Sequence, residues 1–138
     1  MIDRHSNSGD TIILPTPCLA ELLTAVPSVA AAVSEINNSS YFEIASFDAK
    51  SAIELAIETQ NAISLGDKKS GIQASWNEVK FDRQIAIVAK VNSAEIFYTD
   101  DTNQASFANK LGISVKHTWE LDLPPQYAQR SFLDGDEK

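Results

Sequence analysis

Cysteine, histidine and long apolar runs are scarce in this sequence. Its 138 residues include one cysteine and two histidines. A single cysteine excludes an internal disulfide and a cysteine-based zinc site, and it favours a reducing compartment. No apolar run approaches the ~20 residues that a membrane helix needs, and the polar N-terminus does not resemble a signal peptide. These absences predict a cytoplasmic protein that does not enter a membrane.

Positive charge is also in short supply. The chain has 11 Lys and Arg residues against 19 Asp and Glu residues, a net charge of −8. This balance argues against broad binding to nucleic-acid phosphates, which relies on clustered basic residues. It leaves room for an enzyme that holds nucleic acid through metal ions, because a bound cation inverts the local field at an acidic site.

Glycine motifs of the nucleotide-binding folds are missing. Only five glycines occur, and they form neither a dinucleotide-binding fingerprint nor a phosphate-binding loop. No serine stands on the tight glycine turn that Ser-His-Asp hydrolases of the α/β type use. Cys18 lies within an apolar helical pattern, so we interpret it as a packed residue rather than a nucleophile.

Strand and helix signals alternate along the chain. Strands are predicted near residues 11–14, 41–47, 94–98 and 113–116, and helices near 17–25, 28–36, 49–65, 75–92 and 103–111. Strands that alternate with helices predict an α/β fold with a mainly parallel sheet covered on both faces, a three-layer α/β/α arrangement. The length suits one domain, residues 1–125, followed by a weakly ordered acidic tail at 126–138.

Local signals define several helix ends and faces. Thr16 before Pro17 predicts a helix start with a capping hydroxyl, and Asp48 predicts the cap of the 49–65 helix. That helix carries an apolar stripe, formed by Ala49, Ala52, Ile53, Leu55, Ala56 and Ile63. The 75–92 helix carries Val79, Ile85, Ala86 and Ala89 on one side, and Gly112 predicts the end of the 103–111 helix.

Four acids fall where an α/β sheet places its ligand sites, beyond the carboxyl ends of the strands. They are Glu21, Asp82, Asp100 and Asp101. Carboxylates that converge at one edge repel each other unless a cation lies between them, and oxygen ligands suit Mg²⁺ or Mn²⁺. Such an ion can generate a hydroxide nucleophile and stabilise the charge on a phosphate.

Each acid also has a structural explanation. Glu21 would be stabilised near a helix N-terminus by the dipole. Asp82 would form an ion pair with Lys80 or Arg83 on a solvated face. One of Asp100 and Asp101 would be a turn or cap residue of the helix that follows.

Four segments together resemble the PIN-domain family of nucleases. Residues 12–23 are similar to its strand, Pro or Thr, and Glu before leucines, and residues 81–89 to its Asp-x-x-Ile-x-x-x-Ala helix. Residues 97–101 look like its Thr-x-Asp strand end, and residues 112–115 like its closing Gly-Ile-x-Val strand. The order and spacing of these motifs extend from about residue 11 to residue 116.

The resemblance implies a ribonuclease that hydrolyses RNA phosphodiesters with Mg²⁺ or Mn²⁺. Glu21, Asp82 and Asp101 would be the catalytic and metal-binding residues, and Thr99 and Asp100 would position the substrate. Some members of the family are toxins of bacterial toxin–antitoxin pairs that a partner protein holds inactive. The resemblance therefore also implies an RNA substrate, an antitoxin-type partner and a homodimer.

The N-terminus departs from the family pattern. PIN domains open with a strand that ends in an Asp, followed by a helix, whereas only ten residues precede Thr11 here. Asp3 is the one acid near a suitable place, but the segment from Asp3 to Thr11 is too short for a strand exit, a helix and a return. We interpret residues 1–5 as the end of that first helix, so that the first metal ligand and the central strand are absent.

Two other hypotheses follow from this departure. In the first, the chain is a non-catalytic, truncated PIN-like binding or regulatory protein, which would fold without metal affinity. Alternatively, a second copy would supply the absent segment by dimer exchange.

Overall fold

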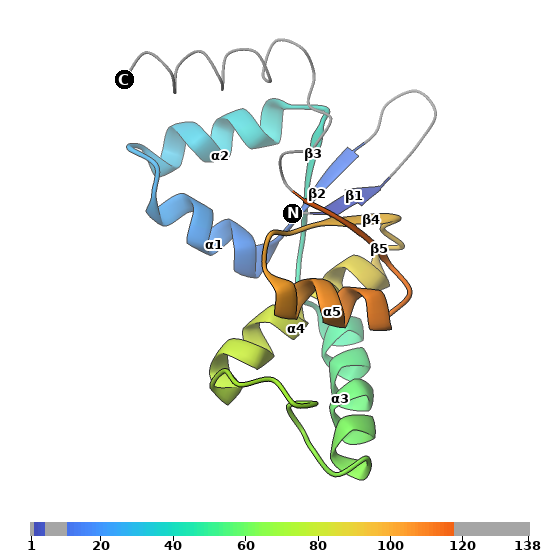
Figure 1. Ribbon diagram of the computed structural model, residues 1–138. Helices are drawn as coiled ribbons and strands as arrows, with labels where there is room; N and C mark the ends of the chain where they lie inside the picture. Colours follow the sequence, from blue (N-terminus) through green and yellow to red (C-terminus); the bar gives the residue numbers. More distant parts are fainter. Residues whose placement is uncertain (1, 5–10, 118–138) are drawn as a thin grey trace.

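The computed structural model describes residues 2–4 and 11–117 of the chain. The described part is a mixed α/β fold with a five-stranded sheet and the helices α1 to α5 (Figure 1). Its strands are β1 (Ile2–Arg4), β2 (Thr11–Pro15), β3 (Phe42–Ala45), β4 (Ile96–Tyr98) and β5 (Ser114–Lys116). Its helices are α1 (Thr16–Thr24), α2 (Val29–Asn38), α3 (Ala49–Ser64), α4 (Trp76–Val91) and α5 (Thr102–Lys110). The predicted acidic tail at 126–138 lies outside the described residues.

The sheet has the strand order β3-β2-β1-β4-β5. β2 is parallel to β3 and β4 is parallel to β5, whereas β1 is antiparallel to both β2 and β4. Four strands therefore share one direction and the central strand opposes them. The α/β class predicted from the sequence is confirmed, and the sheet is mixed because of this one strand.

β1 corrects the interpretation of the N-terminus. Residues 1–5 were expected to end a helix and to leave the centre of the sheet without a strand, but Ile2–Arg4 is a strand at that centre. Ile2 pairs with both Ile13 and Phe97, which gives partners to backbone groups that would otherwise be buried without hydrogen bonds. Six residues separate β1 from β2, too few for a parallel crossover but enough for an antiparallel connection.

α4 is the central helix of the core. Val79, Ile85, Ala86 and Ala89 are all buried, as their spacing predicted, and Ile87 and Val88 are buried with them. All of these side chains except that of Val79 pack with Ile13, Phe97 and Phe107 in one apolar cluster. Ser75 caps the helix by accepting a hydrogen bond from the backbone of Glu78 at 3.2 Å. The sequence therefore fixes both the start and the buried face of this helix.

α3 shows a different face from the one its apolar stripe suggested. Ile53 is 62% exposed and Ile63 is 55% exposed, while Ser51 and Ala62 are buried. The helix packs on α4 through this second face, where Glu54 contacts Lys90 at 3.0 Å. The predicted cap is confirmed, because Asp48 accepts a hydrogen bond from the backbone of Ser51 at 3.0 Å.

α1 begins differently from the expectation. Its N-cap is Pro15, and no side chain caps the helix. The hydroxyl of Thr16 instead accepts a hydrogen bond from the backbone N–H of Phe47 at 3.3 Å. Thr16 therefore ties the start of α1 to the segment after β3. Cys18, on the same helix, packs against the core as predicted.

Candidate functional site

Asp82, Thr99 and Asp101 are joined by Gln104, a residue for which the sequence predicted no role. The Gln104 amide donates to Oδ1 of Asp82 at 3.2 Å, and its Oε1 accepts the Thr99 hydroxyl hydrogen at 2.7 Å. The Thr99 Oγ1 in turn accepts from the backbone N–H of Asp101 at 3.1 Å. One hydrogen-bond chain thus connects α4, the end of β4 and the start of α5.

Asp101 has a structural role within this chain of contacts. It is the N-cap of α5, and its Oδ1 accepts from the backbone N–H groups of Asn103 at 2.8 Å and Gln104 at 3.0 Å. The cap explanation offered for one of the two neighbouring aspartates is therefore confirmed for Asp101. The carboxylate remains exposed.

Asp82 is partly buried in this network. Burial raises its carboxyl pKa, and the negative charges of Asp101 and Glu78 raise it further, while the hydrogen bond from Gln104 opposes the shift. Ion pairing with Lys80 or Arg83 was the structural explanation from the sequence. Within the described residues, Asp82 is bonded to Gln104 instead.

Glu21 lies on the second turn of α1 and is exposed. The helix begins at Thr16, so Glu21 lies beyond the first turn in which a helix dipole stabilises an acid. Burial raises the pKa of the nearby Cys18 thiol, and the charges of Asp82 and Glu21 both add to this rise. Cys18 is therefore close enough to two of the three predicted acids to interact with their charges.

Asp100 faces another partner. Its Oδ1 lies 3.6 Å from Nδ1 of His117, which follows β5. Both side chains are about half exposed, 49% for Asp100 and 56% for His117. The structure thus places Asp100 toward the edge strand, whereas Asp101 turns toward α5.

The three predicted metal ligands do not form a closed set. Among the residues that the structure describes, no group of three or more His, Cys, Asp or Glu side chains could hold a metal ion as placed. Asp82 and Asp101 are close enough to interact electrostatically. Asp3 belongs to the central strand, paired in register with Ile12 and Ile96.

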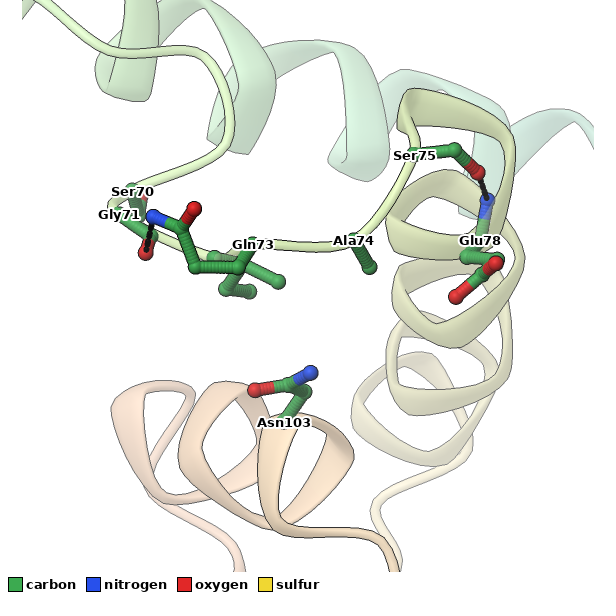
Figure 2. A pocket seen from close by; sticks show the side chains of 8 residues that line it. Ser70, Gly71, Gln73, Ala74, Ser75, Glu78 and Asn103 are labelled. Atoms are coloured by element: carbon green, nitrogen blue, oxygen red, sulfur yellow. Dashed lines mark hydrogen bonds between the residues drawn. The ribbon is translucent and has the colours of Figure 1, made fainter.

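An open groove of about 580 Å³ lies beside this network (Figure 2). Its wall consists of the segment between α3 and α4, the first turn of α4 and the first turn of α5. Figure 2 shows Asn103 pointing from α5 across the groove toward the segment that carries Gln73 and Ala74. Glu78, whose charge affects Asp82, also lines the groove. The groove therefore borders the first turn of α4 at Glu78, whereas Asp82 and Asp101 are not part of its lining.

Gln104 could have been suspected from its sequence position. Asp101-Thr102-Asn103-Gln104 matches the pattern of a capping box, in which a residue three positions after the N-cap returns a hydrogen bond to the cap. Here the Gln104 side chain contacts Thr99 and Asp82 instead. The contact with Asp82 joins residues 22 positions apart, which no local pattern reveals.

No helix in the described ranges, 2–4 and 11–117, has the length and apolar character to cross a membrane. Comparison of the sequence with known protein families gives no match, and comparison with curated proteins gives none.

Proposed function

We propose that this chain is a PIN-like, metal-dependent ribonuclease that hydrolyses RNA phosphodiesters. The observation that supports the proposal best is the linked pair of carboxylates, Asp82 and Asp101, on one hydrogen-bond chain with Thr99. Asp82 and Asp101 repel each other in this arrangement. A divalent cation bound between them would remove that repulsion, and their oxygen ligands suit Mg²⁺ or Mn²⁺.

The roles of the side chains follow from their contacts. Asp82 and Asp101 would hold the cation, with Glu21 as the third acid from α1. When bound, the ion would activate water and stabilise negative charge on the phosphate. Gln104 would hold the Asp82 carboxylate in place, and Thr99 would fix the start of α5 and thereby Asp101. The groove lined by Asn103 and Glu78 would admit the RNA strand.

The fold supports the same lineage in outline. The family's opening strand is central in its sheet, and β1 occupies the central position here, although in the opposite direction. We propose that the fold is a three-layer PIN-like arrangement in which β1 occupies the position of the family's opening strand.

A partner protein and a second copy are part of the proposal. α1 and α2 contain no buried residue, and they expose Leu22 by 47% and Val29 by 52%. An antitoxin-type protein or a second protomer could cover these side chains. A mass measurement by light scattering across a concentration series would show whether the chain forms the expected homodimer.

The test of function combines cleavage with metal binding. Purified protein is incubated with labelled structured RNA and Mn²⁺, beside Asp82→Asn and a control, Glu35→Gln, which removes one exposed negative charge from α2. We expect cleavage by the wild type and Glu35→Gln, and none by Asp82→Asn. Cleavage that is independent of metal, or equal in all three proteins, would contradict the proposal.

A second function, binding without catalysis, is favoured by one observation. As placed, the described acids offer no set of three ligands for an ion, and one oxygen of Asp101 already caps α5. A protein of this kind would fold without metal affinity. Calorimetry with Mn²⁺ separates the two functions, because a measurable heat that Asp82→Asn abolishes fits only the nuclease.

A further inference from the structure

Arg83 is a buried cation without a counterion in the described part of the chain. It is only 2% exposed, and its one hydrogen bond runs from Nη1 to the backbone oxygen of Lys68 at 2.8 Å. Its Nε has no hydrogen-bond partner. The guanidinium lies against the rings of Phe107 at 5.2 Å and Trp76 at 5.8 Å. Aromatic faces attract a cation, but they supply no acceptor for its N–H groups.

This arrangement is energetically incomplete. A guanidinium stays protonated in proteins, and a buried charge without a partner costs several kcal/mol. Burial lowers the pKa of Arg83, and the negative charges of Asp67 and Glu58 oppose this effect without cancelling it. Asp67 uses its two oxygens on the backbone N–H groups of Lys69 and Gly71. Glu58 lies 3.8 Å from Lys90, its ion-pair partner.

A cavity of about 110 Å³ lies beside Arg83, between α3, α4 and α5. Ala62, Leu65 and Phe107 form its apolar wall. Its polar lining consists of Arg83, Lys110, Asn61 and Ser70, all of which can donate hydrogen bonds, and one carboxylate, Glu58. Two cations and two neutral donors around a small, partly open space suit an anion with several acceptor oxygens.

We propose that this cavity binds a phosphate group, with Arg83 and Lys110 as its two cationic contacts. The volume suits one tetrahedral oxyanion and is too small for a nucleoside attached to it, so free phosphate fits completely and a phosphate ester enters by its phosphate alone. Arg83 neighbours Asp82 in sequence but contacts Lys68, Trp76 and Phe107 rather than the acidic network. The site is therefore independent of the proposed nuclease function.

Binding at this site would also order the α3–α4 connection. Arg83 holds the backbone oxygen of Lys68, and Ser70 lines both this cavity and the open groove. Ser70 has a φ of 53°, a left-handed conformation unusual for a residue other than glycine. An anion that bonds to Ser70 and Arg83 would stabilise this conformation.

The experiment is a titration of the full chain with inorganic phosphate, followed by calorimetry and by thermal unfolding in the absence of added metal. Lys110→Gln removes one cationic contact at the end of α5. Lys50→Gln removes an equal charge at the start of α3, whereas the cavity lies near the end of that helix. We expect phosphate to bind the wild type, Lys110→Gln to weaken binding about tenfold, the effect of one charge-assisted hydrogen bond, and Lys50→Gln to change it less than about twofold.

Two further arms complete the test. Glu58→Gln should strengthen phosphate binding, because it removes the one negative charge from the lining. Adenosine monophosphate distinguishes the source of the phosphate group: equal affinity indicates an ester that enters by its phosphate, and weaker affinity indicates the free ion. Two results would overturn the proposal. One is the absence of phosphate binding at about 10 mM, a concentration well above the ~1 mM dissociation constant of a weak site. The other is an equal loss of phosphate affinity in Lys110→Gln and Lys50→Gln.

Discussion

Replacement of Asp101 separates two roles that one carboxylate combines in this protein. Its Oδ1 accepts hydrogen bonds from Asn103 at 2.8 Å and Gln104 at 3.0 Å at the start of α5. Asp101→Ala removes this acceptor, and the loss of such an N-cap costs about 0.5–2 kcal/mol. Asp101→Asn keeps an oxygen with nearly the same capping strength. The two variants therefore lose the same charge but only one of them loses the cap.

The expected magnitudes follow from the exposure of the site. Asp101 is exposed, so water partly replaces the lost acceptor, and we expect Asp101→Ala to lower the free energy of unfolding by about 1 kcal/mol. For a chain of this size that corresponds to about 3–5 °C in Tm. Asp101→Asn loses a dipole interaction of about 0.3–1 kcal/mol, which is offset because repulsion with Asp82 also disappears. Its net change should remain within about 0.5 kcal/mol.

The assay is urea unfolding followed by circular dichroism, together with calorimetric titration of Mn²⁺ for both variants. We expect only Asp101→Ala to lose stability, whereas both variants lose metal affinity. Equal destabilisation of the two variants would refute the capping argument, because the charge alone would then account for the effect. Retention of wild-type Mn²⁺ affinity in Asp101→Asn would refute its assignment as a metal ligand.

Three further predictions concern the pH dependence, the core and a turn. The pKa of the Asp82 carboxyl is raised in the folded chain, so the folded chain binds the carboxyl proton more tightly than the unfolded chain does. The stability gained from this tighter binding is present below the unfolded pKa of about 3.9 and is lost as pH rises through the folded pKa. Asp82→Asn should therefore raise the free energy of unfolding at pH 7 and not at pH 3, as measured by urea unfolding at both pH values. The pKa of Asp67 is lowered instead, so Asp67→Asn should lower the free energy of unfolding at pH 7. A change of the same sign in both variants would contradict the argument. Phe97→Ala should cost about 3–5 kcal/mol, because Phe97 is fully buried, and a loss below about 1 kcal/mol in chemical unfolding would disagree with its central place. Gly112 has a φ of 85° and open space where a Cβ would lie, so Gly112→Ala should cost about 1–2 kcal/mol through backbone strain alone, and an unchanged Tm would disprove this.

The sequence predicted most helices because their signals are local. Asp48 caps α3 as predicted, and α4 begins at the predicted place, after Ser75. Gly112 follows α5 with a positive φ that suits glycine. The buried face of α4 followed from its apolar spacing. Each of these features depends on residues within a few positions of one another, so one sequence is enough to identify them.

The candidate site was predicted only in part. Asp82, Thr99 and Asp101 do share one hydrogen-bond chain, but Gln104 joins them, and Asp100 lies toward His117 instead. The side-chain direction of two adjacent aspartates depends on how α5 begins after β4. Sequence spacing placed both at the sheet edge and could not distinguish them.

What the sequence determined by itself was the order of the helices α1 to α5 and of the strands β2 to β5, the acidic charge balance and the cap of α3 at Asp48. Only the tertiary structure decided that Ile2–Arg4 is a central antiparallel strand, that α3 packs through Ser51 and Ala62 rather than through its isoleucines, and that Arg83 is buried. The physical reason is that capping and periodicity act over one or two helical turns. Strand partners, helix rotation and the burial of a charge depend instead on contacts between residues far apart in the chain.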